Sequence, residues 1–195
     1  MNKNGTVNKD IFIIPFVSPF GSMTDIVTNS PRDTLTGLIT ETLTDTLWDT
    51  VTNAHADELY SPPPAKGEEF ATLSIPVLDI TLPIYEGTTE EDLKNGVGHY
   101  SNSVLPGEKD NSVLSGHRDT VFRNLDLLEK GDLLIVTTKE HTFTYKVKKI
   151  RIVDKDDKTV IVPKPRATLT LTTCYPFHYI GSAPKRYIIE AFFVS

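Results

Sequence analysis

The stretch 168–176, Thr-Leu-Thr-Leu-Thr-Thr-Cys-Tyr-Pro, alternates threonine with leucine and then reaches the single cysteine of the chain, Cys174. Alternation with a period of two predicts a β-strand with one face in a hydrophobic core. Tyr175-Pro176 ends this strand, because proline lacks the N–H group that a sheet requires. A thiol at a strand end, followed by a loop, suits attack on a carbonyl group. A lone cysteine in this position is nevertheless more often structural than catalytic, so both interpretations stay open at this point.

The sequence around this strand is typical of an all-β domain. From about residue 70 onward, short runs of β-branched and aromatic residues alternate with turn signals, as in a barrel or a sandwich. The candidate strands cover residues 71–75, 80–85, 112–115, 132–138, 142–153, 160–162, 168–173 and 186–194. Two short helices interrupt them. One opens with a capping-box spacing at Thr88 and Glu91, and the other covers Val121–Leu128.

Residues 1–70 are predicted to be an N-terminal extension of the β-domain, which takes residues 71–195. The extension begins with an irregular lead that shows no sustained period. Apolar residues then recur at every fourth position, which predicts an amphipathic helix over about 31–56. These residues are Leu35, Ile39, Leu43, Leu47 and Val51. The Pro-rich linker 61–64 ends the helical region.

The composition predicts a globular protein with one core. The chain has 195 residues, of which 38% are hydrophobic and 24% are charged. Its longest apolar run, Ile11 to Phe20, is interrupted by prolines and falls short of the roughly 20 apolar residues that span a bilayer. The same run fits a signal peptide poorly, since no small-residue cleavage site follows it. We therefore expect no transmembrane segment in this chain.

The charges exclude some functions and leave others open. The formal net charge is −6, yet residues 139–166 hold nine Lys or Arg against four Asp or Glu. An anionic polymer or an ordinary solvated hairpin explains this basic stretch equally well, and nucleic-acid binding is not indicated. A single cysteine excludes an internal disulfide and a Cys-pair metal site, and no histidine pair stands at ligand spacing. We expect neither a metal nor a cofactor.

Two further polar residues stand where predicted strands end or begin. His117 lies in the segment Ser-Gly-His-Arg-Asp at a polar turn after a hydrophobic strand, and Arg186 opens the last strand. If the strands around Cys174 and Arg186 are antiparallel neighbours, the eleven-residue loop Tyr175–Lys185 brings these two residues to one rim. Taken alone, each is more often an ordinary surface group. Competing candidates in the same loop are His178 and Lys185.

Together these segments resemble the sortase family. Residues 170–174, Thr-Leu-Thr-Thr-Cys, match the sortase signature Thr-Leu-x-Thr-Cys, with a strand-ending Gly-His upstream and an Arg downstream. The resemblance covers about residues 72–195 and is strongest to class D. The segments that carry it are Gly-Val-Gly-His-Tyr (96–100), Gly-His-Arg-Asp-Thr (116–120), Cys-Tyr-Pro-Phe (174–177) and Ala-Pro-Lys-Arg-Tyr (183–187). The resemblance implies an eight-stranded sortase-type β-barrel with short helices.

The resemblance also implies a mechanism and a place of action. Cys174 is the nucleophile, His117 the general acid/base and Arg186 the oxyanion stabiliser, with Thr173 and Tyr175 as substrate-binding residues. The implied reaction cleaves a Leu-Pro-x-Thr-Gly-like sorting signal after Thr through a thioacyl-enzyme. It then transfers the surface protein to an amine of a peptidoglycan precursor or of a pilin. The implied location is the extracellular face of the membrane or the cell wall of a Gram-positive bacterium, although the hydrophobic anchor common in the family is not evident here.

Two other functions remain open at the sequence level. A non-catalytic β-barrel module for adhesion or cell-wall binding would keep Cys174 buried and inert. A plain cysteine peptidase would use the thiol without transfer to an amine. Two roles are also open for Asp119: it either orients His117 through a hydrogen bond or simply forms the turn.

Overall fold

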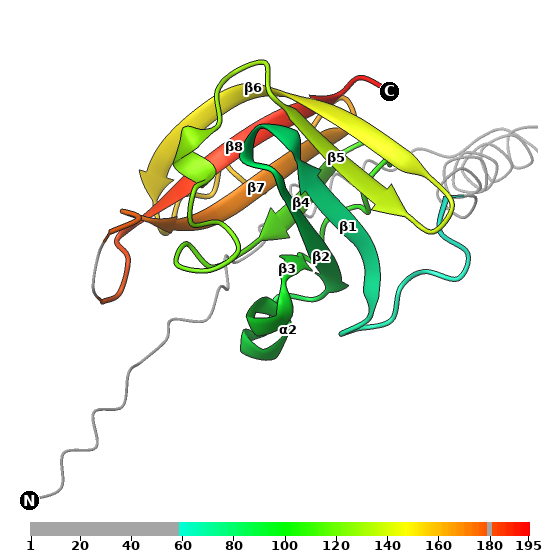
Figure 1. Cartoon of the computed structure of the whole chain (residues 1–195), viewed down its shortest axis with the longest axis horizontal. Helices are drawn as coiled ribbons and strands as arrows, with labels where there is room; N and C mark the ends of the chain where they lie inside the picture. Colours follow the sequence, from blue (N-terminus) through cyan, green and yellow to red (C-terminus); the bar gives the residue numbers. More distant parts are fainter. Residues whose placement is uncertain (1–58, 179–180) are drawn as a thin grey trace, which may run out of the picture. The chain divides into compact units, whose positions relative to one another are not determined.

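The computed structural model of the chain describes residues 59–178 and 181–195, in which the strands form a closed barrel (Figure 1). The strands are β1 (Glu69–Ile75), β2 (Ile80–Glu86), β3 (Val97–His99), β4 (Asn111–Ser115), β5 (Leu133–Thr138), β6 (Thr142–Asp154), β7 (Thr168–Tyr175) and β8 (Lys185–Phe193). Their order around the barrel is β1-β2-β3-β4-β7-β8-β6-β5, and β5 closes the barrel by pairing with β1. The predicted all-β barrel with eight strands is confirmed. The predicted lead and the helix over 31–56 lie outside the described residues.

One strand of the barrel differs from the prediction. Residues 160–162 form bends, not a strand, in the connection between β6 and β7. The Nδ2 group of Asn111 donates to the carbonyl oxygens of Val160 and Val162, each at 3.1 Å, so these carbonyls bond to a side chain instead of a neighbouring strand. The strand that completes the barrel is β3, which is parallel to β2 and antiparallel to β4. Its three residues are too few to show the alternation that identifies a strand in a sequence.

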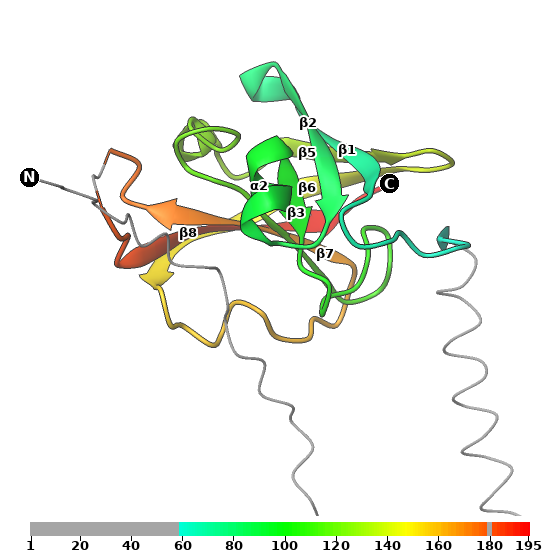
Figure 2. The ribbon, with the colours of Figure 1, turned by 90° about the horizontal axis from the view of Figure 1, so that it is seen from below.

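The first predicted helix is α2 (Glu90–Asn95), which lies beside β3 on the outside of the barrel (Figures 1 and 2). Its capping box lies one residue later than the predicted one. The Thr89 hydroxyl accepts the Asp92 N–H at 3.3 Å, and Asp92 Oδ2 accepts the Thr89 N–H at 2.8 Å. The same carboxylate also accepts the Thr89 hydroxyl at 2.7 Å, so the helix start is fixed by three mutual bonds.

The second predicted helix, over Val121–Leu128, is wrong as an α-helix. This segment forms turns and a short 3-10 helix, η2 (Leu125–Leu127). Its buried hydrophobic residues are spaced by three, which suits the three residues per turn of a 3-10 helix. They are Phe122, Leu125 and Leu128. A further 3-10 helix, η1 (Pro76–Leu78), connects β1 to β2.

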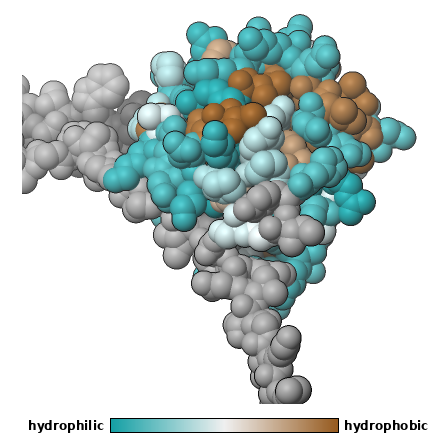
Figure 3. Space-filling model, turned by 90° about the vertical axis from the view of Figure 1, so that its left-hand side faces the viewer, coloured by the Kyte–Doolittle hydropathy of each residue, from teal (hydrophilic) through white to brown (hydrophobic). Residues whose placement is uncertain are grey.

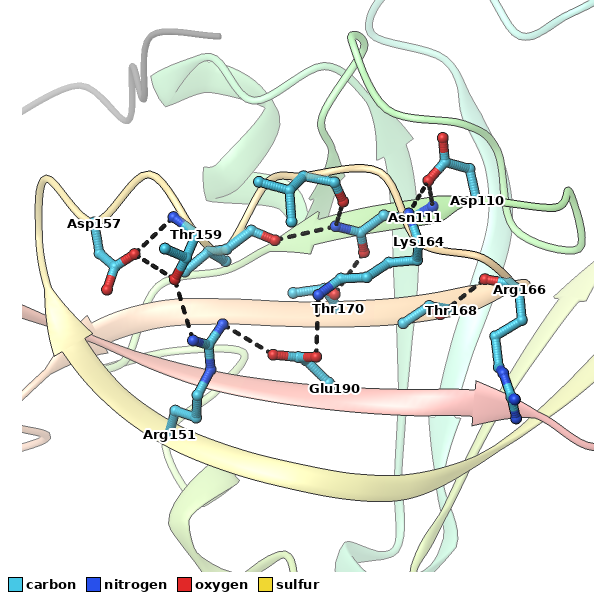
Figure 4. Close-up of polar contacts among 12 residues, drawn as sticks. Asp110, Asn111, Arg151, Asp157, Thr159, Lys164, Arg166, Thr168, Thr170 and Glu190 are labelled. Atoms are coloured by element: carbon cyan, nitrogen blue, oxygen red, sulfur yellow. Dashed lines mark hydrogen bonds and ion pairs between the residues drawn. The ribbon is translucent and has the colours of Figure 1, made fainter. Parts of the chain in front are cut away.

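β7, which is parallel to β4 and antiparallel to β8, is buried on both of its faces. Leu169 and Leu171 are fully buried and pack in the barrel core, whereas Thr170 and Thr172 are equally buried on the opposite, outer face. Residues 155–167, which connect β6 to β7 and are here named the covering segment, run over this outer face (Figure 4). The strand therefore has a covered side even outside the barrel.

A polar network fastens the covering segment to β4, β7 and β8 (Figure 4). Thr170 Oγ1 donates to Asn111 Oδ1 at 2.6 Å, and Asn111 in turn holds the two carbonyls named above. Glu190 of β8 lies 2.9 Å from Nη2 of Arg151 and 3.2 Å from Nζ of Lys164. A buried carboxylate requires partners of this kind. The network thus fixes the segment at the ends of these strands that are remote from Cys174.

Candidate active site

The other ends of β4, β7 and β8 meet at one rim of the barrel. β4 runs parallel to β7 with Ser115 opposite Thr172, and β7 runs antiparallel to β8 with Cys174 opposite Arg186. His117 comes two residues after Ser115, and Cys174 comes two residues after Thr172. Both residues therefore lie at the same rim of the barrel, where β4 and β7 end. The structure therefore brings His117, Cys174 and Arg186 to three neighbouring strand ends.

Cys174 and Arg186 project from the same side of the sheet. Directly opposite residues of an antiparallel pair have their Cβ atoms about 4.5–5.5 Å apart. β7 and β8 are antiparallel neighbours. The loop between them is shorter than the eleven residues expected, because β7 includes Tyr175 and β8 includes Lys185. The guanidinium group is thus within side-chain reach of the thiol.

Gly116 joins the end of β4 to the turn that carries His117, and it packs closely against both β7 and Phe122. Its N–H donates to the Thr172 carbonyl at 3.2 Å, and its carbonyl accepts the Thr173 hydroxyl at 2.7 Å. A Cβ atom at Gly116 would lie 2.7 Å from Cδ2 of Phe122, which is closer than real Cβ contacts. Glycine therefore allows the strand end to pack under the following turn. The backbone of His117 follows directly from this hydrogen-bonded glycine.

The three side chains differ in how they are held. Cys174 and His117 are half-buried, and neither side chain makes a hydrogen bond to any residue that the structure describes. Arg186 is 8% exposed, and its Nη1 donates to the carbonyl oxygens of Ala183 and Lys185, each at 3.0 Å. The positive charge is therefore fixed by backbone carbonyls, whereas the thiol and the imidazole remain available to a substrate.

The two residues predicted to bind substrate have different surroundings. Thr173 is fully buried, and its hydroxyl donates a hydrogen bond to the Gly116 carbonyl. Tyr175 is half-buried and belongs to an aromatic cluster with Phe177 and Tyr187. The ring centroids are 6.2 Å apart for Tyr175 and Tyr187, 5.2 Å for Phe177 and Tyr187, and 5.9 Å for Tyr175 and Phe177. Their contact with substrate stays a prediction.

Tyr187 is the buried member of this cluster, with 8% of its surface exposed. Burial raises the pKa of the Tyr187 phenol, and the negative charge of Asp126 and the nearby Tyr175 raise the pKa further.

Hydrophobic surface accompanies this rim. Figure 3 views the side of the molecule that carries the end of β7 and the start of β8, and it shows hydrophobic areas among hydrophilic ones. Leu127 is 62% exposed, and Ile152, which pairs with Tyr187 across β6 and β8, is 47% exposed. Ile152, Tyr187 and Thr173 lie opposite one another across β6, β8 and β7, so the Ile152 side chain is on the other face of the sheet from Cys174 and Arg186.

His99 has a structural role, and the two competing candidates named from the sequence are exposed. His99 is buried, with Nδ1 2.6 Å from Oε2 of Glu86 and Nε2 2.9 Å from the carbonyl oxygen of Val104. Both of its ring nitrogens are therefore occupied within the fold. His178 and Lys185, the competitors in the loop after Cys174, lie on the surface.

Arg118 is a residue to which sequence reasoning assigned no role. Its Nη1 donates to the Pro176 carbonyl at 2.9 Å and its Nη2 to the Gly181 carbonyl at 3.1 Å. Both acceptors lie in the connection between β7 and β8. The only local signal is that Arg118 follows His117, because contacts across about 60 positions leave no periodic pattern in a sequence.

Two negative findings apply to residues 59–178 and 181–195. No group of three or more His, Cys, Asp or Glu side chains in this part of the chain is arranged to hold a metal ion. None of the helices found there combines the length and the apolar character needed to cross a bilayer.

Comparison with known proteins gives one consistent family. Residues 73–194 match the family model described as a sortase domain. Sortase D of Bacillus subtilis is 52% identical to this chain over 127 residues, which are 65% of this chain and 64% of that protein. The chain thus spans less than two thirds of the length of the curated relatives it matches.

Solved structures give the same result. The catalytic domain of SrtD from Bacillus anthracis is similar at 47% identity and a TM-score of 0.59, with 67% of this chain and 90% of that chain covered. Sortase A from Corynebacterium diphtheriae is similar at 31% identity and a TM-score of 0.63, with 73% and 68% covered.

Proposed function

This chain belongs to the sortase family, and on that premise we propose that it is a cysteine transpeptidase with Cys174 as nucleophile, His117 as general acid/base and Arg186 as oxyanion stabiliser. The observation that carries the proposal is the register of β4, β7 and β8. Cys174 is opposite Arg186, and Ser115, two residues before His117, is opposite Thr172, two residues before Cys174. Residues 71–195 form the catalytic barrel in this proposal, and residues 1–70 precede it.

The first half of the reaction forms a thioester. The Cys174 thiolate attacks the carbonyl carbon of the peptide bond after Thr in a Leu-Pro-x-Thr-Gly-like signal, and the electron pair moves to the carbonyl oxygen. The Arg186 guanidinium stabilises this oxyanion, and one such donor contributes about 2.7–4 kcal/mol. As the C–N bond breaks, His117 gives its proton to the departing amine.

The second half transfers the acyl group. An incoming amine attacks the thioester, His117 accepts the proton that this amine loses, and the Cys174 thiolate is released. The acceptor is an amine of a peptidoglycan precursor or a pilin lysine, and the donor is a surface protein with a C-terminal sorting signal. The reaction takes place on the extracellular face of the membrane or in the cell wall of a Gram-positive bacterium.

Two features of the site support this proposal over the alternatives. A binding module would keep its thiol buried and inert, but Cys174 is half-buried with a fixed positive charge opposite it. The Cys174 thiol also makes no hydrogen bond to a described residue, which leaves it available to a peptide. A plain cysteine peptidase fits the same geometry and differs only in the fate of the thioester.

The experiment is a transfer assay that separates these functions. The protein and its Cys174→Ala variant are incubated with a library of quenched Leu-Pro-x-Thr-Gly-type peptides, with and without an amine, and the products are identified by mass spectrometry. We expect cleavage after Thr and an amide product that contains the added amine, both absent from the variant. Acid product alone, at the same rate with and without amine, would indicate a peptidase, and no cleavage at all would favour a binding module.

A further inference from the structure

Arg118 joins two loops of the site that are far apart in the sequence. It lies in the turn after β4, next to His117, while two of its acceptors, the carbonyl oxygens of Pro176 and Gly181, lie in the connection after β7. One acceptor is two residues beyond Cys174. A single side chain therefore ties the turn that carries the histidine to the connection that follows the cysteine.

The guanidinium group is well suited to this connection. Its nitrogens lie in one rigid plane, so two hydrogen bonds from one group fix both the distance and the orientation of what they join. Charge-assisted bonds of this kind are also stronger than bonds between neutral groups. The measured lengths of 2.9 and 3.1 Å are those of formed hydrogen bonds.

The position of His117 depends on such a support. The imidazole makes no hydrogen bond to any described residue, so no carboxylate or carbonyl there orients the ring. What fixes it is the backbone on each side. On the strand side this is Gly116, bonded to Thr172 and Thr173. Within the turn, the His117 carbonyl accepts the N–H groups of Phe122 at 3.0 Å and Thr120 at 3.4 Å. Arg118 is the residue that ties this turn to the connection after β7.

The same connection is also held by the proposed oxyanion stabiliser. Arg186 donates to the carbonyl oxygens of Ala183 and Lys185, whereas Arg118 donates to those of Pro176 and Gly181. The connection between β7 and β8 is therefore held by two guanidinium groups, one from the turn after β4 and one from β8. Loss of the Arg118 bonds would free the part nearest Cys174.

From this geometry we infer that Arg118 is a positioning residue, which sets the separation of the His117 imidazole and the Cys174 thiol and so controls proton transfer more than peptide binding. The inference rests on the proposed function. A misplacement of about 1 Å between reacting groups can lower a rate by about 100-fold. Proton transfer is the step most sensitive to it.

The test compares two arginines of the same turn. Arg118→Met removes the bonds to the β7–β8 connection. Arg123→Met is the matched control. Among the described residues, the Arg123 side chain donates to the Asp119 carbonyl within its own turn, at 3.2 Å from Nε and 2.7 Å from Nη2. We expect Arg118→Met to lower kcat by about 10- to 100-fold with KM changed by no more than about twofold. Arg123→Met should retain the kcat of the wild type.

Two readouts separate positioning from a general loss of structure. The pH profile of Cys174 alkylation by iodoacetamide should change in Arg118→Met and stay the same in Arg123→Met, since it reports how the thiol senses the imidazole. Arg118→Lys, which can reach one acceptor but not form the planar fork, should recover part of kcat. If urea titration shows that Arg118→Met is not folded, the test rests on Arg118→Lys instead. For this variant we expect a lower kcat with an unchanged KM.

The outcomes are distinguishable from failure of the proposed function. If the wild type forms no thioester and transfers no peptide, the proposed function itself is wrong. If the wild type is active and the Arg118 variants keep kcat and the alkylation profile, or lose activity only through KM, the positioning role is overturned. Equal losses in the Arg118 and Arg123 variants also overturn it.

Discussion

The outer face of β4, β7 and β8 has two ends with opposite chemistry. At one end, Asn111, Thr170 and Glu190 bond to one another or to the covering segment, and all three are buried. At the other end, Cys174 and His117 are half-buried and make no side-chain hydrogen bond to a described residue. Because the strands are the same, the difference lies in the side chains and in what covers them. Satisfied polar groups stabilise a fold, and open ones are available for chemistry.

The largest effect that tests this contrast is expected at Cys174. Cys174→Ala should reduce transfer by about 10⁴-fold or more, since loss of a nucleophile removes the whole covalent route. Its free energy of unfolding should change by less than about 1 kcal/mol, because no hydrogen bond is lost. Initial rates and urea titration measure the two quantities. Residual transfer above one per cent of the wild-type rate would place the nucleophile elsewhere.

The second effect concerns the fixed charge at the same end. Arg186→Met should lower kcat by about 10²- to 10³-fold, as expected for the loss of an oxyanion donor. The control is Lys185→Met, which removes a neighbouring positive charge that is exposed. If Lys185→Met lowers kcat as strongly, general electrostatic attraction explains the rate and the pairing of Arg186 with Cys174 does not.

The third effect belongs to the opposite end and should appear in stability. Glu190→Ala leaves Arg151 and Lys164 without their carboxylate, and breaking a buried ion pair from one side typically costs about 3 kcal/mol. Its kcat should stay well above that of Arg186→Met. Glu129→Ala, at an exposed position, is the control for urea titration. A stability equal to that of the control would mean that the network does not fasten the covering segment.

The smallest effect comes from two threonines on the same face of β7. Thr170→Val removes the bond to Asn111 and should destabilise the protein by about 1 kcal/mol. Thr172 is equally buried, but within the described residues its hydroxyl has no hydrogen-bond partner, so Thr172→Val should be neutral or stabilising. The difference between the two variants measures the hydrogen bond itself. An equal loss in both would show that valine is simply accommodated poorly on this face.

The strand that ends at Cys174 was easier to predict from the sequence than the polar network at the other end. Alternation in 168–173 identified β7. The sequence brought Cys174 and Arg186 to one rim on the condition that their strands are antiparallel neighbours, and the structure meets this condition. These are local signals, which a single sequence contains. β3 could not be found in this way, since its three residues are defined by pairing with β2 and β4 and not by a pattern of their own.

The network end was missed for a related physical reason. Glu190 lies within a hydrophobic strand, where a carboxylate looks like an outward-facing residue. Its burial is possible only because Arg151 and Lys164 arrive from distant positions. Asn111 likewise bonds to carbonyls about 50 positions away, and this bonding turned the predicted strand 160–162 into bends. Polar contacts between distant segments depend on the finished fold.

The central claim, that Cys174 becomes acylated by a sorting-signal peptide, is tested most directly by intact-mass analysis of the enzyme mixed with a Leu-Pro-x-Thr-Gly-type peptide in the absence of an amine. We predict a mass increase equal to the acyl part of the peptide, located on Cys174 by fragmentation and removed by hydroxylamine, as for a thioester. Cleavage of the peptide without such an adduct, or an adduct that persists in Cys174→Ala, would contradict the account.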